Sequence, residues 1–506
     1  MALISTAVLV GLGIWFRTRG MFGTPMPFWL DECAWGSLLF DKPLSELLIR
    51  PIGFMAVSKL IAAHVSASEP WLRALPWMAG LGTVVLSVFL GARLFKGWGA
   101  RLFLVAALAL NTEAIDYARE FKPYACGLFL HLAVLFLAVR AHGSHARRDL
   151  VAVLVVAVLA VLFTQDMVFA YPGLFGVLAA DELRAKRRTE LALVVGAALA
   201  AAGLLVVQYV FIWSRLGSTE SEYWGNRYDV FFVGTGFAAH LRWHAEKLWD
   251  VLAFPGVHGT WSSTELSDSA VSQMSTVYRA AWLVLHLAGV TLLFRARRFA
   301  VATLLLLPLV TASLFNVAGL WPWGAFRTNT FLLAYTCSIA AFAFESRAWQ
   351  WLGVAGLAPA AALLVPVFVL EPEWERQIHA PIRSLPMRDV VRELIDAQGP
   401  DLPAAPETLI VDAYHCEPWR YYSLYNPVTR AMLGADAEKR FRPVCAEDEP
   451  SLIAILRGLE TKPGRVWLLR AKGKRPLGAD RIVNKHFVAE SKGRVGASLR
   501  FALRAR

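Results

Sequence analysis

The stretch RALPWMAGLGTVVLSVFLGARL, residues 73–94, decides the fold class. Its interior between Arg73 and Arg93 is uncharged, and a helix needs about 20 such residues to cross the roughly 30 Å hydrocarbon core of a bilayer. The rest of the chain is similar: of 506 residues, 57% are apolar and only 18% are charged, and the mean hydropathy is +0.47. This composition excludes a soluble protein of this length and indicates an integral membrane protein.

Apolar runs of comparable character occur at residues 2–16, 51–67, 73–94, 102–116, 123–140, 150–164, 167–180, 190–213, 280–294, 299–317, 329–344 and 350–370. If all of them crossed, short basic loops would lie on both faces of the membrane, whereas such loops normally stay cytoplasmic. The run 51–67 is short and carries Lys59 and His64, so we expect it to lie in the interface. Eleven spans then place the N-terminus in the cytoplasm and the C-terminus outside.

The first run is the weak point of this topology, because Arg17 and Arg19 follow it on the outer side. A secretory signal peptide is the alternative interpretation, although neither a basic segment before the run nor an A-x-A cleavage site is present. A start codon placed too late would also explain the run.

The composition becomes that of a soluble domain after residue 370, so the sequence predicts a membrane domain over 1–370 and an extracytoplasmic α/β domain over 371–506. Helical periodicity in MRDVVRELIDA, EPWRYYSLY and SLIAILRGL alternates with the strand patterns TLIVDA and RVWLL. Residues 451–506 contain 14 Lys and Arg against three acidic residues, so much of the net charge of +12 is a basic tail. This distribution does not indicate a nucleic-acid partner.

The five cysteines contain no C-x-x-C pair, which argues against a zinc or thioredoxin-like site. Cys416 and Cys445 both lie in the C-terminal domain and would be able to pair in an oxidising compartment. Two unpaired thiols are the alternative. Cys126 and Cys337 fall within apolar runs, where they are expected to pack as small apolar residues.

The first outer loop, residues 17–72, contains two adjacent carboxylates, Asp31 and Glu32. They follow Trp29 and stand immediately before an amphipathic stretch. A carboxylate is suited to accept a proton from a hydroxyl nucleophile or to bind a metal ion. The structural alternative for Asp31 is a helix N-cap, and the two roles are compatible.

Further polar residues surface on the same predicted face. The second outer loop, residues 111–124, contains the candidate site residues Tyr117, Glu120, Lys122 and Tyr124. The alternative interpretation is a solvated membrane edge with a belt of tyrosines. Arg50, before Pro51, is placed where a guanidinium could fork two hydrogen bonds to a lipid phosphate, or simply snorkel. A later loop presents Trp323 and Arg327.

In combination, the motifs WLDE, RPIGF, SEPWLRALPWMAG, YAREFKPY and WPWGAFRTNTFLL resemble the bacterial membrane glycosyltransferases related to glycosyltransferase family 39. These belong to the GT-C superfamily, which includes protein O-mannosyltransferases and lipid A aminoarabinose transferases. The similarity covers residues from about 10 to 345. It implies an all-α polytopic GT-C fold with about 11 transmembrane helices and juxtamembrane helices in the first outer loop.

The resemblance implies an inverting glycosyltransferase in the bacterial inner membrane. It would move a sugar from a polyprenyl-phosphate donor to an acceptor hydroxyl of a lipid, glycan or protein, in cell-envelope glycan biosynthesis. Asp31 matches the family's general base, and Glu32 would position the base or the acceptor. The matching phosphate-binding cations are Arg50, Lys122 and Arg327, and the substrate-binding residues are Glu120, Tyr117, Tyr124 and Trp323.

Two departures bear on metal binding and on the donor. Ile49 and Arg50 stand where many relatives carry a small or polar pair, and the acidic residue that some relatives place after the second-loop tyrosine is missing after Tyr124. We therefore expect no metal site and no required cofactor, although a divalent cation remains compatible. His240 and His244 share an i, i+4 spacing but no third ligand is evident.

The long loop over residues 214–279 is rich in aromatic residues, which suit sugar rings, so it would be able to act as an acceptor-gating lid. A pair of interfacial helices anchored by tryptophan is its alternative. The residues concerned are Tyr223, Trp224, Trp243, Trp249, Trp261, His240, His244 and His258. Other functions compatible with many spans are an oligosaccharide polymerase or ligase with a lipid-diphosphate donor, a lipid or glycan transporter, and a non-catalytic scaffold.

Overall fold

The computed structural model describes residues 2–22, 28, 30–42, 51–211, 230–232, 235–253, 269–324, 327–345, 387–398, 407–434, 441–446, 448–459, 465–471, 483, 485, 487–495 and 498–505. The chain forms two compact units. The first contains residues 1–19, 44–56 and 73–370, and the second contains residues 20–43, 57–72 and 371–506. The sequence division at residue 370 placed the first outer loop in the membrane domain, whereas most of this loop is compact with the C-terminal segment.

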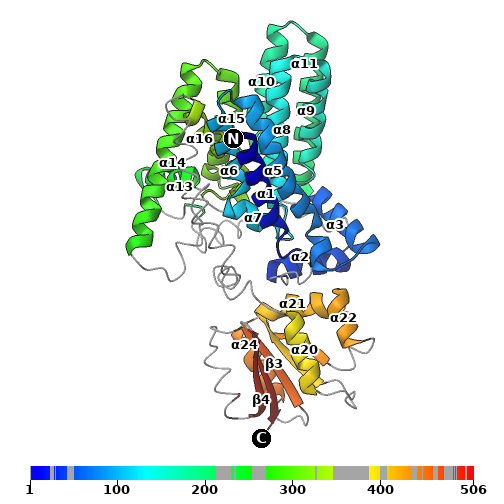
Figure 1. Ribbon diagram of the computed structural model, residues 1–506. Helices are drawn as coiled ribbons and strands as arrows, with labels where there is room; N and C mark the ends of the chain where they lie inside the picture. Colours follow the sequence, from blue (N-terminus) through cyan, green and yellow to red (C-terminus); the bar gives the residue numbers. More distant parts are fainter. Residues whose placement is uncertain are drawn as a thin grey trace. The chain divides into compact units, whose positions relative to one another are not determined.

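The first unit is helical (Figure 1). Its elements are α1 (Ala2–Thr18), α5 (Ala74–Leu94), α6 (Trp98–Ala109), α7 (Thr112–Ala118), α8 (Tyr124–Ser144), α9 (Arg147–Ala160), η2 (Gln165–Phe169), α10 (Tyr171–Arg184), α11 (Arg188–Phe211), α13 (Phe237–Ala253), α14 (Ser269–Arg295), α15 (Phe299–Val317), η5 (Arg327–Leu332), α16 (Leu333–Phe342) and η6 (Ala343–Glu345). Helices α9, α10 and α11 lie side by side, and α14 packs on α16 (Figure 1).

Four helices among the described residues, α5, α8, α11 and α15, are long and apolar enough to cross a membrane. Several other predicted runs are divided into shorter helices. The run 102–116 breaks between α6 and α7 because the Asn111 side chain accepts a hydrogen bond from the Ala114 amide, 2.8 Å, and starts a new helix. The run 350–370 lies outside the described residues.

Arg17, which complicates the predicted topology, is fully buried at the end of α1. Its guanidinium donates hydrogen bonds to the carbonyl oxygens of Gly13, Leu108 and Ala109, at 3.0, 2.8 and 2.7 Å. The last carbonyls of α6 lack partners within their own helix, so a cation there is satisfied and stabilising. Arg17 therefore acts as a packing contact between α1 and α6, unlike the exposed basic residues that orient a membrane protein.

The second unit contains a five-stranded sheet with the order β2-β1-β3-β5-β4, in which β1 pairs parallel with β2 and β3 while β5 pairs antiparallel with β3 and β4. The strands are β1 (Glu407–Asp412), β2 (Phe441–Ala446), β3 (Arg465–Ala471), β4 (Phe487–Val495) and β5 (Ser498–Ala505). The helices are α2 (Leu30–Asp41), most of α3 (Ile52–His64), α4 (Glu69–Leu72), α20 (Met387–Gln398), α21 (Ala413–Leu424), α22 (Pro427–Leu433) and α24 (Glu449–Leu459).

Helices cover both faces of this sheet. Leu452 and Leu456 of α24 pack with Ile410 and Leu468 on one face. Strand residues alternate between faces, so Trp467 points to the other face, where Phe441 lies between its ring and that of Trp419 of α21 at 6.3 and 6.0 Å. Every helix and strand that the sequence predicted in this domain is present.

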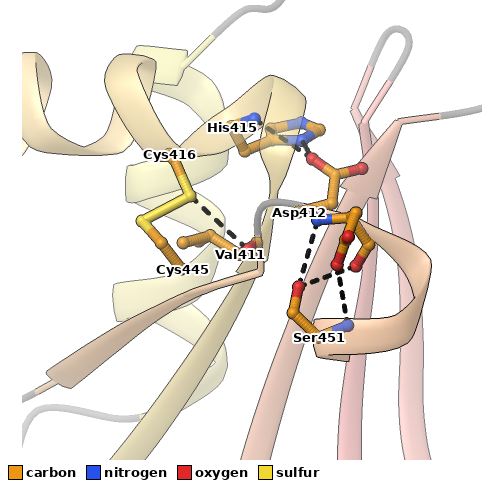
Figure 2. The surroundings of a disulfide bond; sticks show 7 residues. Val411, Asp412, His415, Cys416, Cys445 and Ser451 are labelled. Atoms are coloured by element: carbon orange, nitrogen blue, oxygen red, sulfur yellow. Dashed lines mark hydrogen bonds and ion pairs between the residues drawn. A yellow bond between two sulfur atoms is a disulfide. The ribbon is translucent and has the colours of Figure 1, made fainter. Parts of the chain in front are cut away.

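A disulfide joins Cys416 in the first turn of α21 to Cys445 of β2, with Cα atoms 5.6 Å apart (Figure 2). Of the two alternatives for these cysteines, the paired one is therefore correct. Next to it, His415 pairs with Asp412 at 2.6 Å, at the point where β1 passes into α21. These contacts fix the start of α21 to the carboxyl end of the parallel strands.

Candidate active site

Asp31 and Glu32 lie in the first turn of α2. Because the helix begins at Leu30, Asp31 is inside the helix and does not occupy the N-cap position, although its charge still favours the positive end of the helix dipole. The Asp31 side chain is partly exposed, whereas Glu32 is 1% exposed. Asp31 is thus the more accessible of the two carboxylates, as an acceptor-activating base requires.

Helix α2 packs along α21 of the same unit. A Cβ atom on Gly36 would lie 2.8 Å from the Tyr421 ring, so only glycine permits this approach of the two helices. At the end of α2, Asp41 pairs with Arg420 at 3.0 Å and accepts a hydrogen bond from the Tyr425 hydroxyl. The Phe28 ring, just before α2, stacks on Tyr421 with centroids 5.0 Å apart.

Burial raises the pKa of Tyr422 well above its usual value, and the carboxylate of Glu69 raises it further. Burial and hydrogen bonding to Asp41 raise the pKa of Tyr425 to about 12. Both hydroxyl groups therefore keep their protons near neutral pH and donate hydrogen bonds to carboxylates.

The second outer loop buries its charged side chains. Glu120 and Lys122 are 7% and 3% exposed, and Tyr117 is 6% exposed. The Tyr117 and Tyr124 rings meet edge to face, with centroids 5.1 Å apart. Ionisable groups are rarely buried unless other groups compensate them, so this loop is more than a solvated edge.

The late loop, which begins at Trp321 and leads into η5, is held by the side chain of Asn329 in η5. Its side chain accepts a hydrogen bond from Trp321 Nε1 at 2.9 Å and donates to the carbonyl oxygens of Pro322 and Gly324 at 3.0 and 2.9 Å. Trp323 is 1% exposed, and Arg327, at the start of η5, is partly exposed. The predicted ligand Trp323 is therefore a buried support of the loop.

The two loops are neighbours in the first unit, because η5 packs against both α7 and α8. The structure thus brings the segment of Arg327 together with the segments that carry Tyr117 and Tyr124. Asp31 and Glu32 belong to the other unit. Arg50 lies outside the described residues.

Beneath these loops lies a buried polar network that the sequence analysis did not identify. His131 of α8 bonds the Tyr335 hydroxyl of α16 at 2.7 Å and Asp166 of η2 at 3.0 Å. Thr164 donates to Asp166 at 2.5 Å. A Cβ atom on Gly127 would lie 2.8 Å from the Asp166 carboxylate, so glycine admits this network under the first turn of α8. Charged groups at such depth are costly and usually functional.

The long loop is partly helical. Helix α13 carries Trp243, Trp249, His240 and His244, whereas Tyr223, Trp224, Trp261 and His258 lie outside the described residues. The carbonyl oxygen of Val230 accepts hydrogen bonds from the Trp323 amide and Asn316 Nδ2, at 2.9 and 3.0 Å. This loop therefore contacts the late loop of the predicted site.

Metal ligation has no support in the described part of the chain. His240 and His244 approach to 3.0 Å between their Nε2 atoms, but no group of three or more His, Cys, Asp or Glu residues suited to a metal ion occurs there. The absence of a metal requirement stays a prediction.

Comparison with known proteins gives a match only at the level of structure. No protein-family model matches the chain, and no curated protein sequence matches it. The crystal structure of ArnT from Cupriavidus metallidurans in the apo state superposes with a TM-score of 0.53, covering 99% of this chain and 97% of that chain at 14% identity. The chain has the ArnT fold. The structure of ArnT bound to undecaprenyl phosphate gives a TM-score of 0.52 with the same identity and coverage.

The ArnT fold confirms the predicted architecture, a large helical domain with a small C-terminal α/β domain. The apolar helices α5, α8, α11 and α15 support a multi-pass membrane protein, and the shared fold agrees with this. Because the match extends over nearly the full length of both chains, the C-terminal unit is part of the shared architecture.

Proposed function

We propose that this protein is an inverting membrane glycosyltransferase that transfers a sugar from a polyprenyl-phosphate carrier to an acceptor hydroxyl at the extracytoplasmic face. The observation that carries the proposal is the ArnT fold over 99% of the chain. The order of the loop motifs supports the same activity. A polyprenyl phosphate is the proposed donor carrier because ArnT has been crystallised with undecaprenyl phosphate.

In the proposed reaction, the acceptor oxygen attacks the anomeric carbon as its proton passes to Asp31. The bond from that carbon to the phosphate oxygen breaks, and the lipid phosphate leaves with an additional negative charge. Arg50, Lys122 and Arg327 would stabilise this charge, because cations fixed in advance favour the transition state over the ground state. Glu32, which is buried beside Asp31, would position the base.

Glu120 and the two tyrosines of the second loop would bind the sugar or its phosphate linkage. The partly exposed ring of Tyr124 is suited to contact a sugar face. Trp323 is proposed in a changed role, as the support of the late loop, because its ring is buried. The donor arrives already activated on its lipid, so the reaction needs no nucleotide.

The Cys416–Cys445 disulfide supports placing the C-terminal domain outside the cytoplasm, because such bonds persist in oxidising compartments. This location agrees with the predicted topology, in which the proposed active-site loops lie on the same face. The bacterial inner membrane is the proposed site of action.

The proposal is tested by mass spectrometry of cell-envelope lipids and glycans in a strain that lacks the gene, complemented with wild-type protein or Asp31→Asn. Loss of a general base slows transfer about 10²- to 10⁴-fold, so the missing sugar should reappear only with wild type. Asp389→Asn, on the exposed face of α20, is the matched control and should restore it. Full restoration by Asp31→Asn at equal membrane abundance would refute the role of the base.

Donor binding gives a separate test with undecaprenyl phosphate as the probe. Each of Arg50→Ala, Lys122→Met and Arg327→Met should weaken its binding to the purified protein roughly 10-fold or more, because a hydrogen bond to a charged group contributes about 1.5–3 kcal/mol. Unchanged affinity in all three variants would remove the phosphate site from these residues.

A further inference from the structure

Glu69, in the first outer loop, is a fully buried carboxylate with three partners from the C-terminal domain. Arg388 of α20 contacts Oε1 through Nη2 at 2.6 Å and Nε at 3.0 Å. The Tyr422 hydroxyl of α21 donates to Oε1 at 2.8 Å, and Asn426 Nδ2 donates to Oε2 at 3.0 Å. A buried charge is tolerated when it is paired and hydrogen-bonded in this way, so Glu69 is firmly held.

The Tyr422 hydroxyl connects this carboxylate to the start of α2. Because it donates its proton to Glu69, its oxygen is free to accept a hydrogen bond from the Phe28 amide, at 2.7 Å. Phe28 is three residues before Asp31. A hydroxyl polarised by a carboxylate is a stronger acceptor, and the orientation of its lone pairs is fixed. Glu69 therefore determines where the backbone enters α2.

The other end of α2 is held by the same helix. Arg420 of α21 and Tyr425, the residue directly after this helix, both bind Asp41, and the Phe40 and Tyr425 rings stack with centroids 4.5 Å apart. A helix fixed at both ends to one neighbour keeps its orientation as well as its position.

We infer that Glu69 and Tyr422 are positioning residues, which hold the helix of Asp31 on α21 and so make the C-terminal domain a determinant of catalytic rate. The inference rests on the proposed function of Asp31. It makes no use of donor recognition, because Lys122 and Arg327 belong to the other unit.

Two measurements on the full-length purified protein test this inference, starting with hydrogen–deuterium exchange. Tyr422→Phe removes the link to Phe28 while retaining the ring. Exchange at residues 28–42 should rise at least about 10-fold, because the amide at the start of the segment loses its acceptor. Arg388→Gln should have the same effect, whereas Arg392→Gln, one turn along α20 in an exposed pair with Asp389, should not.

Kinetics with the sugar donor identified from the deletion strain distinguish positioning from general stability. Tyr422→Phe and Arg388→Gln should lower kcat roughly 10- to 100-fold, as small misplacements of reacting groups do, with the KM for the donor and the binding of undecaprenyl phosphate unchanged. Arg388→Lys retains the charge and should restore most of kcat. If Tyr422→Phe fails to fold, Arg420→Gln at the more exposed end of α2 replaces it.

The inference is overturned if exchange at residues 28–42 is unchanged in these variants, or if exchange rises while kcat stays at the wild-type value. A fall in kcat that Arg392→Gln reproduces would equally overturn it. Failure of the proposed function looks different, because Asp31→Asn would then transfer sugar normally whatever the exchange measurements show.

Discussion

Removing the Cys416–Cys445 disulfide should destabilise the C-terminal unit by an amount that depends on the number of residues between the two cysteines. The two cysteines are 29 residues apart, and closing a loop of this size in the unfolded chain gives about 3.5 kcal/mol at 25 °C in the chain-entropy account. The double variant Cys416→Ser, Cys445→Ser loses this contribution. For a unit of this size, the midpoint of thermal unfolding should fall by roughly 7–14 °C.

Differential scanning calorimetry of the purified protein, with and without dithiothreitol, measures this change. Cys445 is exposed on β2, so the reductant can reach the bond in the folded protein. Intrinsic fluorescence supplies a second probe, because Trp467 of β3 and Trp419 of α21 are both buried in the folded unit and become hydrated on unfolding. Reduction of wild type should reproduce the effect of the double variant.

The control is the double variant itself, whose midpoint should not respond to dithiothreitol. A shift below about 2 °C on reduction of wild type would refute the entropic reasoning, because that corresponds to less than about 1 kcal/mol. A reductant effect of similar size in wild type and double variant would place the sensitive bond elsewhere.

Three further predictions concern buried polar groups. His131→Ala should destabilise the helical unit by about 3–5 kcal/mol, because Asp166 loses its buried partner, and thermal unfolding in detergent measures this. Gly127→Ala should lower the same midpoint, since the added methyl group meets the Asp166 carboxylate. The raised pKa values of Tyr422 and Tyr425 imply that their stabilisation of the second unit is complete below about pH 10 and is lost as the pH rises through the folded values, about 12 for Tyr425. Tyr425→Phe should flatten this alkaline loss in unfolding measured from pH 8 to 12.

The sequence predicted those elements whose signal is local. The apolar stretch of α5 and the helix α20 both have a strong local pattern, and both are present. Strand β2 was missed, because it is an edge strand with mostly exposed side chains and contains Pro443, which argues against a strand. The strands β4 and β5 lie in the basic tail, where charge obscured the pattern of side-chain alternation.

The candidate site shows the same limit. Asp31 and Lys122 were predicted as site residues because they stand in recognisable local motifs, and their roles stay a proposal. Glu69 stands in one too, within SEPW, yet its partners Arg388 and Tyr422 are 319 and 353 residues away along the chain. A single sequence contains no record of such pairing. The aromatic pattern EPWRYYSLY predicted a helix correctly, but not that its tyrosines face the first outer loop.

Helix α2 is short, and this explains why its packing on α21, far away along the chain, matters for its order. An isolated helix of 12 residues is marginal in water, and α2 contains Gly36 in its interior, which weakens it further. Its order must therefore come from tertiary contacts, and within its own unit α2 packs extensively on α21. Gly36 lowers the intrinsic stability of the helix, but it also permits the close approach of the Tyr421 ring. The same residue therefore weakens α2 as an isolated helix and allows it to pack on α21. The position of the proposed base, Asp31, therefore depends on the domain that holds this helix.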